Sequence, residues 1–174
     1  MQTPATGQRS YQPLPEILRE LQTENIELQR EALEKLAFYF IQQLGLEFKV
    51  WRKRGDMLEK SEVNAIAESA YPIFSRWQIH CKNAPDYKIF EDDIAIEVGL
   101  SMQLKSNVIF VVTTGLFRRK ALSYVGTIIG KTNLTIITID REDLQALVTS
   151  PQALVDILKE KARRTMELRK VAVI

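Results

Sequence analysis

Two segments with the alternating pattern of strands carry polar side chains that could act together on a phosphate group. In the segment 77–82, His80 and Lys82 share one face, and the other face is apolar. In the segment 62–68, Glu62 and Asn64 share one face. If the two strands pair as a hairpin, their carboxylate, amide, imidazole and ammonium groups converge at one end of a sheet. Such a set can bind a divalent metal ion and a phosphate.

Each of these residues also has a plain structural explanation. A histidine such as His80 is by itself more often a hydrogen-bonded structural residue than a ligand. Lys82 can be a solvated charge at the end of a strand, and Asn64 can pair with the neighbouring strand. Cys81 lies on the apolar face and is most simply a buried small hydrophobic residue. The residue types alone therefore leave the functional and structural interpretations open.

Composition and motifs exclude several other classes of protein. The 174 residues suit one domain, and they contain one Cys and one His, which exclude an intrachain disulfide and make a zinc site improbable. No phosphate-binding loop, dinucleotide-binding glycine pattern or nucleophile elbow is present. The first ten residues lack the apolar core of a signal peptide, and the longest apolar run, 108–112, is too short to span a bilayer. We expect a cytoplasmic protein with no membrane partner.

Basic residues gather in clusters although the formal net charge is only +2. One cluster holds Lys49, Arg52, Lys53 and Arg54, a second holds the three residues 118–120, and a third lies in 159–170. Contacts with phosphates need such local clusters rather than a high total charge. Each cluster can equally be a solvated helix face or sheet edge. The DNA-contact candidates are Arg52, Lys53, Arg54, Arg118, Arg119 and Lys120.

The pattern of apolar residues predicts a single α/β domain. A helix with an apolar stripe from Leu33 to Leu44, capped by Thr23 and ended at Gly45, precedes three strands with short links. Those links favour an antiparallel meander. A helix at 90–105, with Ile94, Val98 and Met102 in register, then leads into a β-α-β crossover. The expected product is a mixed five-stranded sheet flanked by helices. The expected strands are 46–52, 62–68, 73–82, 108–113 and 134–139.

The remaining segments complete the predicted organisation. Residues 1–22 form a polar tail and a short helix, residues 23–148 form the core, and residues 149–174 form a C-terminal helix that packs on the core. Pro15 suits the first turn of the short helix, and Ser150 with Pro151 suits the start of the last one. No internal repeat or linker interrupts this order.

Several of these segments resemble the Mrr-type restriction endonuclease family of the PD-D/ExK nuclease superfamily. The segment 77–83 resembles the third core strand, which carries a Gln-Cys-Lys-type signature. The segment 108–117 resembles its buried strand with a Thr-Gly-Phe-type turn, and 133–144 resembles its final strand and Ile-Asp turn. The segment 33–46 resembles the opening helix and Leu-Gly turn. The resemblance spans residues 30–147 and implies a restriction endonuclease-like fold.

The resemblance also implies roles for individual residues. Lys82 matches the catalytic lysine, which orients and activates the attacking water. His80 matches the Glu/Gln position beside the metal, and Asn64 matches the metal-binding Asp. Glu34 matches the glutamate of the opening helix, and the main-chain carbonyl of Cys81 faces the metal. The implied cofactor is Mg²⁺ or Mn²⁺, and the implied substrate is double-stranded DNA, cut by a homodimer or by two sequential nicks.

Two of these positions depart from the family pattern. Asn64 keeps the shape of Asp without its charge, which should weaken binding of Mg²⁺. His80 offers a nitrogen ligand, which suits Mn²⁺ or softer metals better. Glu62 can act as a substitute carboxylate, and Asp56 and Glu59 in the adjoining turn are weaker candidates. Natural loss of a metal site would leave an Asn at position 64. Deliberate replacement of Asp would leave the same residue.

Two principal hypotheses follow. The first is a metal-dependent DNA endonuclease that binds its ion through Glu62, Asn64 and the carbonyl of Cys81 and activates water through Lys82. The second is a catalytically inactive DNA-binding or assembly module on the nuclease fold. A purely structural partner in a larger complex is a third, weaker hypothesis.

Overall fold

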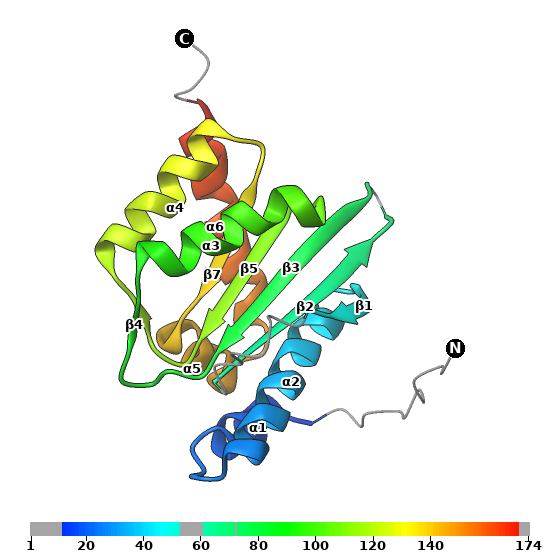
Figure 1. Ribbon diagram of the computed structural model, residues 1–174, viewed down its shortest axis with the longest axis vertical. Helices are drawn as coiled ribbons and strands as arrows, with labels where there is room; N and C mark the ends of the chain where they lie inside the picture. Colours follow the sequence, from blue (N-terminus) through cyan, green and yellow to red (C-terminus); the bar gives the residue numbers. More distant parts are fainter. Residues whose placement is uncertain (1–11, 53–60, 72, 171–174) are drawn as a thin grey trace.

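A mixed sheet with helices on both faces forms the protein, as the computed structural model shows for residues 12–52, 61–71 and 73–170 (Figure 1). The helices are α1 Leu14–Glu20, α2 Ile26–Gln43, α3 Glu91–Leu104, α4 Arg119–Lys131, α5 Arg141–Thr149 and α6 Ala153–Lys170. The strands are β1 Glu47–Trp51, β2 Glu62–Ser69, β3 Ser75–Lys82, β4 Lys88–Ile89, β5 Val108–Thr113, β6 Leu116–Phe117 and β7 Thr135–Ile139.

The main sheet has five strands in the order β1-β2-β3-β5-β7. The first three strands are antiparallel neighbours, and β3, β5 and β7 run parallel. Short links allow an antiparallel meander, whereas parallel strands need the helical crossovers that α3 and α4 provide. The predicted mixed sheet flanked by helices is therefore confirmed. A separate pair, β4 with β6, lies beside the ends of β3 and β5.

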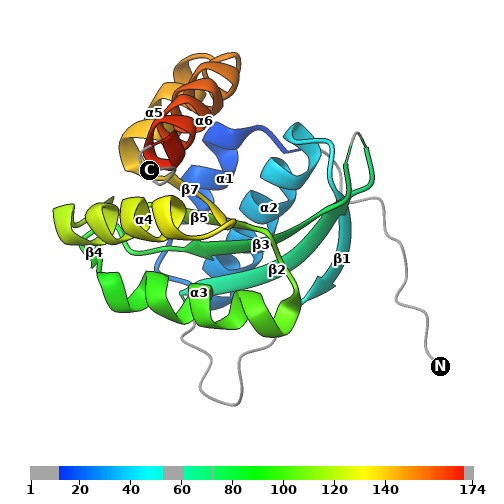
Figure 2. The same ribbon diagram turned by 90° about the horizontal axis from the view of Figure 1, so that it is seen from above.

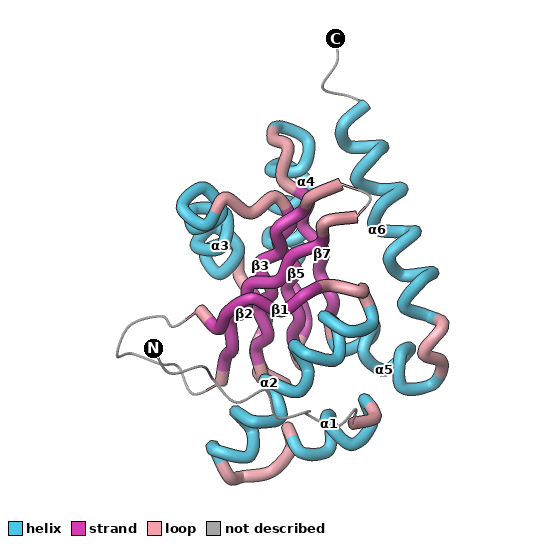
Figure 3. Tube along the Cα trace, turned by 90° about the vertical axis from the view of Figure 1, so that its right-hand side faces the viewer, coloured by secondary structure: helices cyan, strands magenta, loops and turns pink. Residues whose placement is uncertain are grey.

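Two hydrophobic cores lie on opposite faces of the sheet, and Figure 2 shows the helices in two layers. One core joins α1, α2, α5 and α6 to the face of the sheet that carries Val63 and Cys81. The other joins α3 and α4 to the face that carries Ile109 and Val111. The strands β5 and β7 are apolar on both faces because both faces are covered. In the side view of Figure 3 the sheet lies between these two layers.

The residues at the two ends of the long helix α2 explain where the helix begins and ends. The N-cap is Asn25, whose side chain accepts hydrogen bonds from the backbone N–H groups of Glu27 and Leu28 at 3.0 and 3.2 Å. The expected cap at Thr23 is therefore wrong by two residues, because Asn25 is the residue positioned to accept from the first turn. After the helix, Gly45 adopts a φ of +63°, which a side chain would make costly.

An aromatic cluster holds the edge strand β1 against α2. Phe38 of α2 lies 4.9 Å from Phe48 and 5.3 Å from Trp51, measured between ring centroids. Phe48 and Trp51 are themselves 5.0 Å apart. Among the described residues the strand pairs with β2 alone, and these ring contacts pack it against α2.

The buried stripe of α3 differs from the one expected. Ile94, Glu97 and Ser101 are buried, whereas Met102 is 83% exposed and Val98 is only partly buried. The helix is therefore rotated so that a glutamate faces the sheet. The physical reason is that this glutamate finds buried polar partners on the strands, described below.

A glycine permits a close approach between two loops at the carboxyl ends of β3 and β5. A Cβ on Gly115 would lie 2.3 Å from the carbonyl oxygens of both Ala84 and Tyr87. No side chain fits there, so the loop 83–87 rests directly on the backbone that follows β5. None of the helices in the described ranges is long and apolar enough to cross a membrane.

The single cysteine gives a first test of the fold. Cys81 is fully buried on the α2 side of the sheet, and burial raises the pKa of its thiol. Because the reactive form of a cysteine is the exposed thiolate, we expect no labelling of the native protein by a thiol reagent at neutral pH. Full labelling is expected in denaturant, measured as one thiol per chain. Rapid labelling of the native protein would contradict this placement.

Candidate active site

The pairing of β2 with β3 brings the four predicted polar residues together. Glu62 is the direct partner of Lys82, and Asn64 is the direct partner of His80. Residues directly opposite one another in an antiparallel pair point to the same face, so all four share one face. That face is covered by α3. The prediction that Lys82 and Asn64 lie on the same side of the sheet is confirmed.

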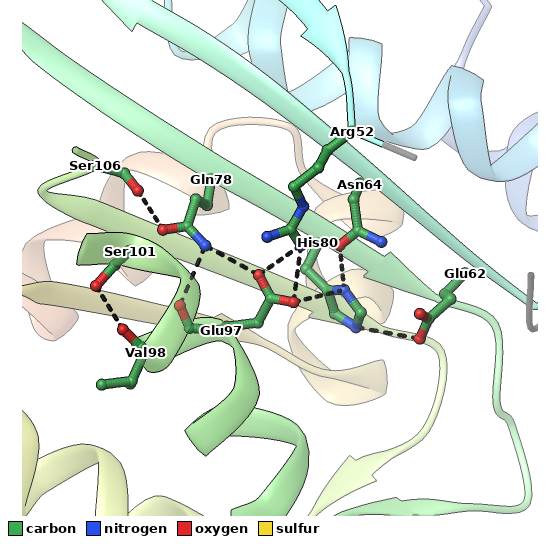
Figure 4. A network of polar contacts seen from close by, with 9 residues as sticks. All are labelled: Arg52, Glu62, Asn64, Gln78, His80, Glu97, Val98, Ser101 and Ser106. Carbon is green, nitrogen blue, oxygen red and sulfur yellow. Dashed lines mark hydrogen bonds and ion pairs between the residues drawn. The ribbon is translucent and has the colours of Figure 1, made fainter. Parts of the chain in front are cut away.

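A buried ion pair lies at the centre of this face, and Figure 4 shows it beside Asn64 and His80. Nη2 of Arg52, just after β1, donates to both carboxylate oxygens of Glu97, at 2.9 and 2.8 Å. The same nitrogen donates to Oδ1 of Asn64 at 2.6 Å. The Glu97 side chain is 1% exposed and that of Arg52 is 12% exposed. A guanidinium therefore occupies the centre of the polar cluster.

The contact with Arg52 fixes the hydrogen-bond roles of Asn64 and His80. Arginine only donates, so the atom of Asn64 that faces it must be the acceptor oxygen. Nδ1 of His80 lies 2.7 Å from that same oxygen, and it must therefore carry a proton. The other ring nitrogen, Nε2, faces the carboxylate of Glu62 at 3.8 Å. The orientation of the imidazole ring thus depends on Arg52 through the amide of Asn64.

Gln78 joins the cluster to α3 and to the loop that precedes β5. Its Nε2 donates to the backbone carbonyl of Glu97 at 3.2 Å and to the carboxylate of Glu97 at 3.1 Å. Its Oε1 accepts a hydrogen bond from Ser106. The buried amide is thereby satisfied on both sides, which the low polarity of the surroundings requires.

Lys82 is the last residue of β3 and lies beside the start of α3, with its side chain 11% exposed. Its ammonium group lies 3.3 Å from Oδ1 of Asp93 and 5.0 Å from the ring centroid of Tyr87. The other carboxylate oxygen of Asp93 accepts from the backbone N–H of Phe90 at 2.9 Å, which fixes the carboxylate in place. These contacts hold the cation at the carboxyl end of the central strand β3.

The structure places the other predicted residues in different surroundings. Glu34 is partly buried on α2, the helix that covers the opposite face of the sheet. Cys81 points its side chain toward that same opposite face. Arg118, Arg119 and Lys120 are exposed at the start of α4. The remaining candidates, Lys53, Arg54, Asp56 and Glu59, lie outside the described residues.

The polar cluster does not fit a hard divalent cation as its described residues are arranged. Nε and Nη1 of Arg52 are buried and have no hydrogen-bond partner among those residues. These orphaned atoms are N–H donors, which call for an acceptor and repel a cation. Within the described ranges, no group of three or more His, Cys, Asp and Glu side chains is arranged to hold a metal ion. The cationic position is taken by the guanidinium.

Two residues of the cluster have roles that the sequence does not predict. Glu97 was not among the candidates, and Arg52 was expected to contact DNA. The signal that could have indicated Glu97 is its spacing from Ile94 and Ser101, which places it on the same helical face as an apolar and a small residue. A carboxylate on such a face needs a cationic partner, and the nearest cationic candidates lay after the first strand.

Comparisons with known proteins give no family and two similar structures. No family model matches the chain, and no curated protein matches its sequence. Among solved structures, the chain is similar to the MspJI restriction endonuclease in complex with a 27-mer oligonucleotide, at 15% identity and a TM-score of 0.48. It is also similar to the DNA modification-dependent restriction endonuclease AspBHI, at 13% identity and a TM-score of 0.47.

The matches cover most of this chain and less than half of each neighbour. They span 94% of this chain and 39% of the MspJI chain, and 96% of this chain and 45% of the AspBHI chain.

Proposed function

We propose that this chain is a duplex-DNA-binding module built on a nuclease-type sheet and that it does not itself cleave DNA. The observation that carries the proposal is the guanidinium of Arg52 held between Glu97 and Asn64. In the resemblance to Mrr-type endonucleases, Asn64 is the metal-binding position. Here the oxygen of Asn64 accepts a hydrogen bond from Arg52. The guanidinium therefore occupies the position that a metal ion would need.

The charge of Arg52 is the physical support for this proposal. Two unit charges about 4 Å apart interact by about 4 kcal/mol at an effective dielectric constant of about 20. A divalent ion beside the guanidinium would therefore meet a repulsion on the order of twice that value. The single carboxylate of Glu97 is already paired with Arg52. A metal ion at this position would have to displace Arg52 from both Glu97 and Asn64.

The basic residues 118–120 supply the proposed contact with DNA. They are exposed at the first turn of α4, where no acidic residue offsets them. The N-terminus of a helix adds partial positive charge from its free N–H groups. The strand pairing of Lys82 with Thr113 places Lys82 at the same end of the sheet as this helix start. Phosphates can thus contact the exposed residues 118–120, and Lys82, whose side chain is 11% exposed, adds positive charge at the same end.

Salt-dependent binding is the test of the proposed DNA contact. Affinity for a labelled duplex, followed by fluorescence anisotropy, should fall steeply as salt is added. Changing Arg118, Arg119 and Lys120 to Gln should weaken binding and reduce the slope of log K against log salt by about 0.9 for each phosphate that is no longer neutralised. A matched control removes the same charge from α6 through Lys159→Gln, Arg163→Gln and Arg164→Gln. Equally weakened binding in both triple variants would show that only total charge matters.

A plasmid-nicking assay separates the proposal from its rival. We expect duplex binding without nicking in Mg²⁺ or Mn²⁺. Metal-dependent nicking that Lys82→Ala abolishes would instead establish the endonuclease hypothesis, in which Glu62 and Asn64 bind the ion. The observation that favours this rival is the direct pairing of Glu62 with Lys82 at the end of the sheet. Absence of both binding and nicking would leave a structural partner as the remaining function.

A further inference from the structure

We infer that Tyr87, Phe90 and Arg118 form a stacking platform that binds an unpaired nucleobase beside Lys82. The inference rests on the proposed function, because it refines which form of DNA the module binds. Lys82 ends β3, Tyr87 directly precedes β4, and Phe90 and Arg118 are the N-cap residues of α3 and α4. Figure 1 shows β4 beside the ends of β3 and β5. None of the three platform residues belongs to the buried cluster around Arg52.

Two neighbouring aromatic rings lie between two cations along the platform. The ammonium group of Lys82 lies 5.0 Å from the ring centroid of Tyr87, and the ring centroids of Tyr87 and Phe90 are 5.3 Å apart. The guanidinium of Arg118 then lies 3.7 Å from the ring centroid of Phe90. A cation over an aromatic ring is attracted by the negative ring face. The two cations therefore hold the rings in place, and the exposed Arg118 also offers its charge to a phosphate.

Hydrogen bonds fix the loop that carries the platform before any ligand arrives. The hydroxyl of Thr114 donates to Oδ1 of Asn83 at 2.8 Å and accepts from the N–H of Ala84 at 2.9 Å. Nδ2 of Asn83 donates to the carbonyl of Leu21 at 2.9 Å, which ties the loop to the end of α1. The close approach at Gly115 adds a backbone anchor. A platform fixed in advance loses little conformational entropy on binding.

The exposure of the platform favours binding of an unpaired nucleobase over contact with the surface of a DNA duplex. Tyr87 is 43% exposed, and Arg118 is exposed, so both are open to a ligand. Bases inside a duplex are covered by their neighbours in the stack, whereas an unpaired base presents its flat face. Aromatic side chains next to cations bind such bases with little sequence preference. The geometry therefore points to DNA in which a single-stranded segment adjoins a duplex.

A pair of DNA probes tests the inference. One is a blunt duplex, and the other is the same duplex with a single-stranded extension. We expect the extended probe to bind about tenfold more tightly, which is within the effect of stacking one base on an aromatic ring. Tyr87→Leu should remove this preference and leave binding of the blunt duplex nearly unchanged. Tyr87→Phe should retain it, because the ring remains.

A second exposed tyrosine supplies the matched control. Tyr71 is 87% exposed in the connection between β2 and β3, at the opposite end of these strands from Lys82. Tyr71→Leu should leave the preference intact. Equal affinity of the native protein for both probes would overturn the platform while leaving the proposed duplex binding in place. Disappearance of the preference in Tyr71→Leu would also overturn it, and no binding to either probe would overturn both proposals.

Discussion

Replacing Glu97 with Gln is expected to lower the free energy of unfolding by about 3–5 kcal/mol, the usual cost of removing one member of a buried ion pair. The carboxylate of Glu97 is the anionic partner of Arg52, and both of its oxygens accept from Nη2. Without it, a guanidinium that is 12% exposed stays in the interior without its charge partner. Urea-induced unfolding followed by circular dichroism measures the change.

Two further variants show whether the destabilisation comes from the ion pair. Glu160→Gln removes a carboxylate from the exposed pair with Arg163, where both side chains are 60% exposed, and should have little effect. The double variant Arg52→Met with Glu97→Leu removes both charges and should recover most of the stability that Glu97→Gln loses. If Glu97→Gln unfolds at the same urea concentration as the native protein, the buried pair does not stabilise the fold.

Binding of Mg²⁺ is expected to appear only when the guanidinium is removed and a carboxylate is supplied at position 64. The double variant Arg52→Gln with Asn64→Asp takes away one positive charge and adds one negative charge in the same cluster. Each change is worth on the order of several kcal/mol to a divalent ion at close range. We expect isothermal titration to detect Mg²⁺ binding in the double variant, and a plasmid-nicking assay to detect the cleavage that follows from it.

The single variants make this prediction specific to the proposed role of Arg52. Asn64→Asp alone should bind Mg²⁺ poorly, because Arg52 would form a charged pair with the new carboxylate. Arg52→Gln alone should also bind poorly, because the amide of Asn64 remains. Strong Mg²⁺ binding by Asn64→Asp alone would show that Arg52 does not occupy the cationic position. Lys82→Ala in the double variant should abolish nicking and retain metal binding.

The sequence predicts the sheet well because its signals are local. The alternation in 62–68 and 77–82, together with short links, is enough to predict an antiparallel hairpin. The apolar strand at 108–113 shows by its composition that both faces are covered. The shared face of Glu62, Asn64, His80 and Lys82 follows from the two-residue repeat and the register of the hairpin.

The composition of the site depends on interactions between residues that are distant in sequence. Arg52 and Glu97 are 45 residues apart, and no local pattern indicates that they meet. The helical repeat in α3 allows Val98 and Met102 to lie on the buried side. The polar partners of Glu97 rotate the helix so that Glu97 faces the sheet instead. The role of Asn64 likewise depends on Arg52, because the same amide would suit a metal if its oxygen did not accept from a guanidinium.

The position of Arg52 next to an edge strand has a consequence for the motions of the protein. Its backbone N–H donates to the carbonyl of Asn64 at 2.7 Å, and β1 has no partner strand on its outer side among the described residues. If β1 separates from β2, the guanidinium leaves the cluster with it. The fraction of molecules with an open cationic position then equals the population of this locally unfolded state. The packing of Phe38 on Phe48 and Trp51 lowers that population, together with the pairing of β1 with β2 and the ion pair of Arg52 with Glu97.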